Sequence, residues 1–157
     1  MSGTGKSHIA IALGHLACVH GYSVRYTTSA DMLSQLHLAL TTQDLQQATR
    51  PFTRCDLLVI DEVGLDQPER QLTKTSDASL FYKVMAARYA AAQSCVITTN
   101  IAWDQWGDYL GDEVATAAIL DRLVHHSHAI TIEGPSWRAH QHSRLNQASA
   151  DEDQAGQ

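Results

Sequence analysis

The chain has 157 residues, which is enough for one domain with a hydrophobic core and too few for two ordinary domains. Its net charge of −6 and its three lysines argue against a generally basic surface that coats nucleic acid, so any contact with DNA must be local. No stretch approaches the ~20 consecutive apolar residues of a membrane span, no secretory signal pattern is present, and the cysteines form no C-x-x-C pair. We therefore expect a soluble, cytoplasmic protein with reduced cysteines and no membrane contact.

Residues 1–7 read as the end of a phosphate-binding loop, G-x-x-x-x-G-K-[ST]. In this motif backbone N–H groups surround the phosphates, the Lys reaches the β- and γ-phosphates and the Ser hydroxyl binds Mg²⁺. The first Gly of the motif would lie one place before Met1. The alternative to a phosphate-binding loop is a glycine-containing turn before an ordinary helix. A helix is predicted directly after the loop, ending at Gly21, with an inward stripe at Ile9, Leu13, Leu16, Ala17 and His20.

A strand and two helices are predicted before Pro51. Alternating residues predict the strand at 23–27. A Thr28-x-x-Asp31 capping box then begins a helix. The inward stripe of this helix is Met32, Leu33, Leu36 and Leu40. A polar helix over 44–50 should close at Pro51, because the residue before a proline avoids the α region.

Residues 56–62 contain four consecutive apolar residues followed by Asp61 and Glu62. This pattern is typical of a buried parallel strand whose carboxyl end opens into a site. Residues 64–76 are predicted to be a loop. Ser76 or Asp77 should begin the next helix, which ends near Gln93. Its inward face is predicted at Leu80, Phe81, Val84, Met85, Arg88 and Tyr89.

The last third of the chain begins with a β-branched run at 94–100, which predicts another buried strand. Trp103, Trp106 and Tyr109 follow at helical spacing, which favours packing in a core or an interface over a cofactor site.

A helix is predicted at Glu113–His125, with Ala117, Leu120 and Val124 facing inward. A last strand is predicted at 129–133, stopped by Gly134.

Alternating helices and strands indicate an α/β fold with a mainly parallel sheet between two helical layers. A phosphate-binding loop requires a strand immediately before it, and no such strand precedes Met1. We therefore expect residues 1–145 to form an ATPase core that lacks its first strand. Residues 146–157 contain no hydrophobic residue larger than Ala and are expected to be a disordered tail.

The acids at 61 and 62 and the amide of Asn100 are expected to lie at the same edge of the sheet, because each follows a parallel strand. Asp61 can hold Mg²⁺ together with Ser7, and Glu62 can polarise a water in line with the γ-phosphate. Asn100 can contact this water or the phosphate. The alternatives are a solvated acid pair and an Asn that caps the following turn.

Four segments together resemble the IstB-like ATPases of the AAA+ class. They are Gly-Thr-Gly-Lys-Ser-His-Ile-Ala-Ile-Ala-Leu, Asp-Leu-Leu-Val-Ile-Asp-Glu-Val-Gly, Val-Ile-Thr-Thr-Asn and Ile-Leu-Asp-Arg-Leu-Val-His-His-Ser-His. Members of this family assist insertion-sequence transposases and are similar to DnaC-type helicase loaders. The likeness runs from Met1 to about Arg138.

The resemblance implies a role for each matching position. The Walker A loop and the start of its helix bind ATP through Gly3, Thr4, Gly5, Lys6, Ser7 and His8. Asp61 and Glu62 match the Walker B acids, with Mg²⁺ on Asp61 and Ser7, and Asn100 matches the sensor. Arg122 matches an arginine finger that completes the ATP site of a neighbouring subunit, whereas its sequence context alone indicates a salt bridge or a helix-end contact.

Two further features are assigned less directly. Arg138 matches a second sensor arginine weakly. His125, His126 and His128 invite a metal site, but no nearby Cys or acid completes a tetrahedral set, so structural or partner contacts are favoured.

The resemblance implies an ATP-hydrolysing transposition helper that forms a homo-oligomer on DNA and acts with a transposase. Two alternatives are a DnaC-like loader that acts with a replicative helicase, and a truncated, non-catalytic binding module. Without its first strand the chain is expected to fold weakly and to bind nucleotide weakly.

Overall fold

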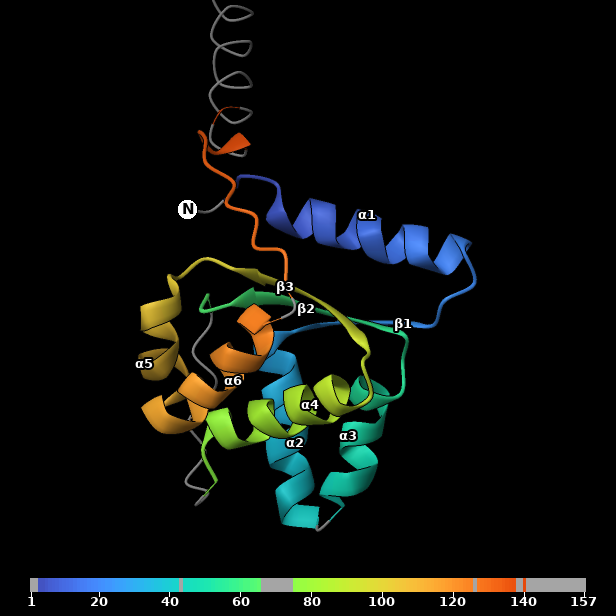
Figure 1. The fold of residues 1–157 in the computed structure, drawn as a ribbon, viewed down its shortest axis with the longest axis vertical. Coiled ribbons are helices and arrows are strands. Elements are labelled where there is room, and N and C mark those ends of the chain that lie inside the picture. Colours follow the sequence, from blue (N-terminus) through green and yellow to red (C-terminus); the bar gives the residue numbers. More distant parts are fainter. Residues whose placement is uncertain (1–2, 43, 66–74, 126, 138–139, 141–157) are drawn as a thin grey trace, which may run out of the picture. The chain divides into compact units, whose positions relative to one another are not determined.

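The computed structural model describes residues 3–42, 44–65, 75–125, 127–137 and 140. The described residues fall into two compact units, one within 7–129 and the other made of 3–6 with 130–137 and 140. The elements, labelled in Figure 1, are α1 (Lys6–Val19), β1 (Val24–Thr28), α2 (Ser29–Thr42), α3 (Leu45–Thr53), β2 (Leu57–Val63), α4 (Asp77–Ala90), β3 (Ser94–Thr99), the 3₁₀ turn Trp103–Gln105, α5 (Trp106–Leu110) and α6 (Glu113–His125). The predicted tail and Arg138 lie outside the described residues.

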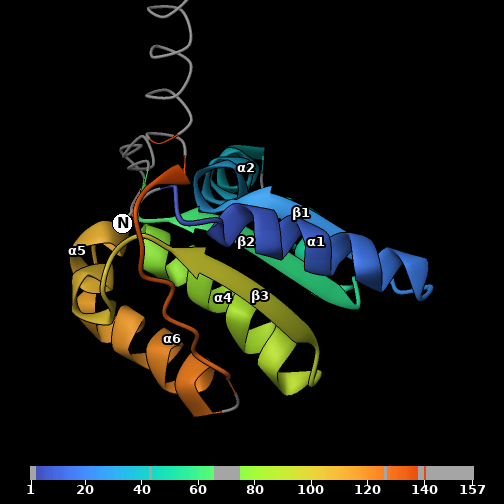
Figure 2. The same cartoon turned by 90° about the horizontal axis from the view of Figure 1, so that it is seen from above.

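The sheet of the larger unit has three parallel strands in the order β1-β2-β3. In the register Tyr26 lies beside Val59, which lies beside Val96. Helix α1 lies over one face of the sheet, and the other helices lie over the opposite face (Figure 2). This is the predicted three-layer α/β/α architecture.

The core lies between the sheet and the helices opposite α1. Leu58 and Ile60 of β2 are fully buried in this core, because alternate residues of a strand point to the same face. The predicted stripes of α2 and α4 are confirmed in most positions. The core residues of these two helices are Met32, Leu33, Leu36, Ala78, Leu80, Phe81, Val84 and Met85. Trp106 and Tyr109 also join the core, whereas Trp103 is exposed.

Helix α1 contacts the sheet through small residues, so the predicted inward stripe was wrong. Ala10 and Gly14 are its buried residues, whereas Ile9, Leu13 and Leu16 are exposed. A Cβ atom at position 14 would lie 3.5 Å from Val24 Cγ1 and 3.8 Å from Val59 Cγ2. The helix axis can approach the strands closely along this small-residue line, which leaves the larger apolar side chains on its flanks.

Helix α3 runs through Pro51, contrary to the prediction that Pro51 ends it. Asp44 caps the helix by accepting a hydrogen bond from the Gln47 amide at 3.3 Å. The proline removes one helical hydrogen bond, but Phe52 directly after it is completely buried, which stabilises the last turn by about 2 kcal/mol. Packing therefore outweighs the local preference.

Helix α6 has the predicted bounds but a different inward face. Thr116 and Ile119 are buried, whereas Ala117 and Val124 are exposed and Leu120 is half-buried. Apolar residues occupy a broad part of the surface of this helix. Packing against α4 therefore buries a face that is displaced by about one residue from the predicted face.

The predicted strand at 129–133 was wrong. Residues 127–133 are irregular in the structure, and Ile130 is exposed. A strand is stabilised by ladder hydrogen bonds with a neighbour, and the described sheet contains only β1, β2 and β3. An apolar, β-branched run alone does not supply that neighbour.

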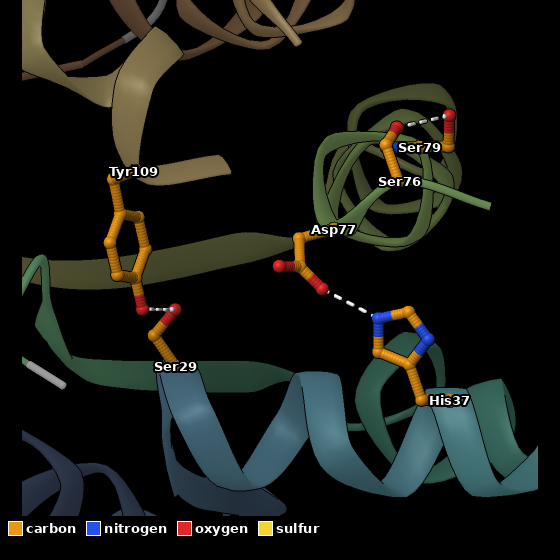
Figure 3. A network of polar contacts seen from close by, with 6 residues as sticks. All are labelled: Ser29, His37, Ser76, Asp77, Ser79 and Tyr109. Carbon is orange, nitrogen blue, oxygen red and sulfur yellow. Dashed lines mark hydrogen bonds and ion pairs between the residues drawn. The ribbon is translucent and has the colours of Figure 1, made fainter. Parts of the chain in front are cut away.

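Polar contacts connect α2 to the start of α4 and to α5 (Figure 3). His37 Nε2 lies 2.5 Å from Asp77 Oδ1, with both side chains almost fully buried. Tyr109 donates to Ser29 Oγ at 3.1 Å. Of the two predicted caps, Ser76 and Asp77, it is Ser76 that caps α4, because its hydroxyl accepts a hydrogen bond from the Ser79 backbone amide at 3.2 Å. In the part of the chain that the structure describes, no helix is long and apolar enough to cross a membrane.

Candidate nucleotide and metal site

Strand β2 carries its two acids at a β-bulge. Ile60 pairs with Ile97 and Val63 pairs with Thr99, so Asp61 and Glu62 together lie opposite the single residue Thr98. Glu62 has a φ of 61°, which is uncommon for a residue other than glycine. Alternation along the strand after Ile60 places Asp61 on the α1 side of the sheet, and the extra residue of the bulge lets Val63 point into the core.

Three hydroxyl groups donate hydrogen bonds to the carboxylate of Asp61. Ser7, in the first turn of α1, donates to Oδ1 at 3.1 Å, and Thr98 of β3 donates to the same oxygen. Tyr26 of β1 donates to Oδ2 at 2.5 Å. The helix after the phosphate-binding sequence and all three strands therefore meet at Asp61, which is only 1% exposed.

These contacts set the protonation of the site. Burial raises the pKa of Asp61, but hydrogen bonds from Thr98, Tyr26, Ser7 and the backbone together hold that pKa below its ordinary value of 3.8. Burial, the hydrogen bond to Asp61 and the negative charges nearby raise the pKa of Tyr26 to about 12. At neutral pH the pair is therefore a carboxylate and a protonated phenol.

The hydroxyl of Thr98 makes a second contact. It accepts a hydrogen bond from the backbone amide of Glu62 at 3.0 Å while donating to Asp61. One side chain thus touches both acidic residues of the bulge. Glu62 itself is half-buried.

Both glycines of the loop at the start of the chain have a positive φ. Gly3 and Gly5 have φ values of 79° and 90°, which L side chains adopt rarely. Lys6 Nζ donates to Thr4 Oγ1 at 3.4 Å. In the same unit the Gly3 carbonyl accepts from the Trp137 amide at 3.0 Å.

The other predicted site residues, Asn100, Arg122 and His8, lie in three places. The backbone amide of Asn100 donates to the Val63 carbonyl at 3.3 Å. Asn100 therefore follows β3 at the carboxyl end of the sheet, which is the edge at which it was predicted to meet Asp61 and Glu62. Arg122 is not brought to this edge. It lies on α6, where it donates to the Ala118 carbonyl at 2.7 Å and stacks over the ring of Tyr82 at 4.9 Å. His8 is exposed in the first turn of α1.

Sequence reasoning missed Tyr26 and Thr98. Both lie on predicted strands, and both share a sheet face with Asp61 because of strand pairing between distant segments. The sequence offered one indication of them: Tyr26 and Thr98 each carry a hydroxyl group on a half-buried strand, at positions that alternate with the residues of the other sheet face. That pattern does not specify which residue of the neighbouring strand they contact.

A protein-family model described as IstB-like ATP binding protein matches residues 1–145. The chain belongs to this family. A Geobacillus stearothermophilus protein, named as a candidate ATP-binding protein of insertion sequence IS5376, is 35% identical over 136 residues, which are 87% of this chain and 52% of that protein. The corresponding IS21 protein of Pseudomonas aeruginosa is also 35% identical over 136 residues, which are 87% of this chain and 49% of that protein. This IstB-like chain therefore spans about half the length of these curated relatives.

Solved structures show that this IstB-like chain has the AAA+ P-loop fold. The DnaC helicase loader superposes with a TM-score of 0.66 at 17% identity, over 84% of this chain and 74% of that one. AMPPCP-bound DnaA from Aquifex aeolicus superposes with a TM-score of 0.62 at 21% identity, over 76% and 36% of the two chains. At these identities the likeness establishes the fold alone.

The donor set of the IstB-like site suits a magnesium ion. Mg²⁺ prefers oxygen ligands and keeps several waters, so it usually needs one or two protein carboxylates. The contact between Ser7 Oγ and Asp61 Oδ1 brings a hydroxyl and an ionised carboxylate to one point. These two side chains would hold the ion, as the sequence predicts.

The histidines near the end of α6 are placed in part. His125 Nδ1 lies 3.3 Å from the Tyr89 hydroxyl, and His128 is exposed. His126 lies outside the described residues. Among the described residues, no group of three or more His, Cys, Asp or Glu side chains is arranged to hold a metal ion.

A hollow of about 480 Å³ opens beside the contact between His37 and Asp77. It is lined mainly by polar and acidic residues from the starts of α4 and α6 and from α5. None of the predicted site residues lines it. The hollow is therefore separate from the predicted nucleotide site.

Proposed function

We propose that this chain binds and hydrolyses ATP with Mg²⁺ as a helper of DNA transposition, acting with a transposase while it oligomerises on DNA. The observation that carries the proposal is the hydrogen bond between Ser7 Oγ and Asp61 Oδ1. It joins the helix that follows the phosphate-binding sequence to the strand that carries both acids. Phosphate binding and hydrolysis require these two groups in one site.

Nucleotide binding is assigned to Gly3, Thr4, Gly5, Lys6, Ser7 and His8. The positive φ angles of Gly3 and Gly5 allow backbone N–H groups to point toward phosphate oxygens. The N-terminus of α1 favours negative charge. Lys6 adds a full positive charge at the first position of that helix.

Hydrolysis is assigned to Glu62 and Asn100 beside Asp61. When bound, Mg²⁺ supplies charge neutralisation on the phosphate oxygens. Glu62 would accept a proton from the attacking water, and its position one residue after Asp61 keeps the base next to the ion-binding carboxylate. Asn100 would orient the water or the γ-phosphate through its side-chain amide.

Arg122 is proposed to act in trans in a homo-oligomer. Its guanidinium contacts its own helix and Tyr82 rather than the acids of its own chain. An Arg supplied by a neighbouring subunit can stabilise the charge that develops on the γ-phosphate. In each ATP site, Asn100 would then come from the chain that binds the nucleotide and Arg122 from the neighbouring subunit.

The choice of partner rests on the relatives. Both proteins at 35% identity are named for insertion sequences, which favours a transposase as partner. The net charge of −6 restricts any DNA contact to local sites, and these contacts are proposed not to depend on sequence. The fold likeness to the DnaC helicase loader keeps a replicative helicase as the second candidate. A pull-down with each purified partner distinguishes them.

The test of the proposed activity is Mg²⁺-dependent ATP turnover by the 157-residue chain. Lys6→Ala should abolish nucleotide binding, and Glu62→Gln should leave binding intact but lower kcat by about 10²- to 10⁴-fold, the usual contribution of a general base. Lys83→Ala and Glu113→Gln are matched controls, because both residues are exposed on helices away from the bulge.

Turnover that is unchanged in Glu62→Gln would show that the catalytic assignment is wrong. A wild-type chain that binds its partner but neither binds nor hydrolyses ATP would instead support the non-catalytic binding module. Loss of activity in the two control variants to the same extent as in the site variants would point to general destabilisation.

A further inference from the structure

The hydroxyl of Thr98 is the group that connects the two acidic residues of the bulge. It donates to Asp61 Oδ1 and accepts from the Glu62 amide at 3.0 Å. Ser7 and Tyr26 also donate to Asp61, but Thr98 is the one of the three hydroxyls that also contacts the backbone of Glu62.

We propose that Thr98 is a positioning residue of the ATPase site, whose hydroxyl sets the orientation of the Asp61 carboxylate and the backbone of Glu62 at the same time. The inference rests on the proposed function and assigns a residue to it beyond the nucleotide-binding, metal-binding and catalytic positions. Thr98 acts through Asp61 and Glu62 and needs no contact with the nucleotide.

The bulge explains why such a residue is required. Because two residues of β2 lie opposite one residue of β3, the regular ladder is interrupted at Asp61 and Glu62. Glu62 also has a φ of 61°, a conformation that persists in a residue other than glycine only where its surroundings hold it. The Thr98 hydroxyl supplies an acceptor for the Glu62 amide at this interruption.

The chemistry of the side chain fits both contacts. A hydroxyl has one donor and two acceptor positions, so it can donate to a carboxylate and accept from an amide simultaneously. Thr98 is only 8% exposed, so water has little access to replace either hydrogen bond. A valine at this position would keep the shape of the side chain and lose both contacts.

A purely structural role predicts a different outcome. Thr27 on β1 is also buried, and its hydroxyl donates to the Thr28 carbonyl at 3.1 Å. Thr27→Val therefore removes a buried strand hydroxyl without touching either acid. It is the matched control for Thr98→Val.

The experiment compares Thr98→Val, Thr98→Ala, Thr98→Ser and Thr27→Val in the 157-residue chain. One measurement is hydrogen exchange of the Glu62 amide by NMR. The other is the kcat, the KM for ATP and the Mg²⁺ concentration that gives half-maximal turnover. Thermal unfolding of each variant identifies any that fails to fold, and the valine and alanine variants remove the hydroxyl with different losses of volume.

We expect Thr98→Val to accelerate exchange of the Glu62 amide at least about 10-fold relative to the amides of Val59 and Ile60. We expect kcat to fall by about 10- to 100-fold, and the Mg²⁺ concentration that gives half-maximal turnover to rise by about the same factor. This is the usual effect of losing a hydrogen bond that orients a metal ligand. The KM for ATP should change little, Thr98→Ser should restore both quantities, and Thr27→Val should resemble the wild type.

An unchanged Glu62 amide in a folded Thr98→Val or Thr98→Ala chain would overturn the proposal, whether or not the chain hydrolyses ATP. Equal losses of kcat in Thr98→Val and Thr27→Val would overturn it as well. If the wild-type chain shows no ATP turnover, the proposed function fails separately, and the exchange measurement still decides whether Thr98 holds Glu62.

Discussion

The hydroxyl of Tyr26 donates a hydrogen bond to Asp61 Oδ2 over 2.5 Å, from the edge strand β1 to the central strand β2. Tyr26 is 43% exposed, whereas Asp61 is buried. The phenol therefore reaches from the protein surface to the carboxylate that is proposed to hold Mg²⁺. After burial, the hydrogen bond to that carboxylate and its charge are the next causes of the raised pKa of Tyr26.

The first prediction concerns this pair. Burial, the hydrogen bond to Asp61 and the charges of Asp61 and Glu62 raise the pKa of Tyr26 to about 12. Since the folded-state value lies above the ordinary value of 10.0, the stabilisation is complete below pH 10.0 and is lost as the pH rises toward 12. Asp61→Asn should lower the pKa of Tyr26, though not fully to 10.0, because burial remains.

Tyrosine ring ¹³C chemical shifts measured between pH 8 and pH 12 test this prediction, and Tyr26→Phe assigns the resonance. Asp56→Asn is the control, because the Asp56 carboxylate accepts from Ser23 and not from Tyr26. A Tyr26 that titrates near 10.0 in the wild type would contradict the hydrogen bond.

The second prediction concerns Arg122. If its guanidinium completes a neighbouring site, Arg122→Ala should lower kcat by on the order of 10³-fold or more, the effect of losing an arginine finger in related phosphoryl transfers. The Arg122→Ala chain still has an intact nucleotide site, and the Lys6→Ala chain still has Arg122. Mixing the two inactive variants should therefore restore part of the turnover.

Steady-state ATP turnover of the mixture, compared with each variant alone, measures this complementation. Arg54→Ala is the control, because Arg54 is exposed at the end of α3. A mixture that gives only the sum of the two variants, at concentrations where the chain oligomerises, would exclude action in trans.

The third prediction concerns stability. Arg88 on α4 is 1% exposed, and its guanidinium donates to the carbonyls of Phe52, Cys55, Asp56 and Ser94. Arg88→Met would leave these carbonyl acceptors without their donor, at about 1–3 kcal/mol for each one that water cannot reach. We expect the free energy of unfolding to fall by about 3 kcal/mol or more.

Urea unfolding followed by circular dichroism measures this change as a shift in the urea concentration at the unfolding midpoint, with the slope m unchanged. Arg54→Met, an exposed substitution of the same kind, should stay within about 0.5 kcal/mol of the wild type. An Arg88→Met chain as stable as the wild type would show that these carbonyl contacts contribute little.

The fourth prediction concerns the pair in Figure 3. His37 Nε2 and Asp77 Oδ1 are 2.5 Å apart, and their side chains are 4% and 10% exposed. His37→Leu leaves the Asp77 carboxylate buried without this partner and should destabilise the chain by about 3–5 kcal/mol. His37→Leu with Asp77→Leu should recover part of that loss, because no unpaired charge is left.

A double-mutant cycle from urea unfolding gives the coupling between the two residues, which we expect at about 1–3 kcal/mol. His15→Leu, on the exposed side of α1, controls for a general effect of replacing histidine by leucine. Additive losses from the two single variants would mean that the contact contributes nothing of its own.

The sequence alone was sufficient for several elements and for the first choice of site. Ser76 or Asp77 was predicted to begin α4, Glu113–His125 to be a helix, and the acids to lie at the end of a buried strand, and all three predictions agree with the structure. These features depend on caps and on periodicity within one segment, which are local properties of the chain. The motifs in that order also indicated the family.

Tertiary structure decided the features that depend on contacts between segments. Packing against the sheet selected the line of Ala10 and Gly14 on α1, and the absence of a paired neighbour in the described sheet left residues 127–133 irregular. Tyr26 and Thr98 reach Asp61 across 35 and 37 residues of sequence. No local pattern encodes such a contact, because strand register and the bulge at Glu62 determine which hydroxyl groups meet the carboxylate.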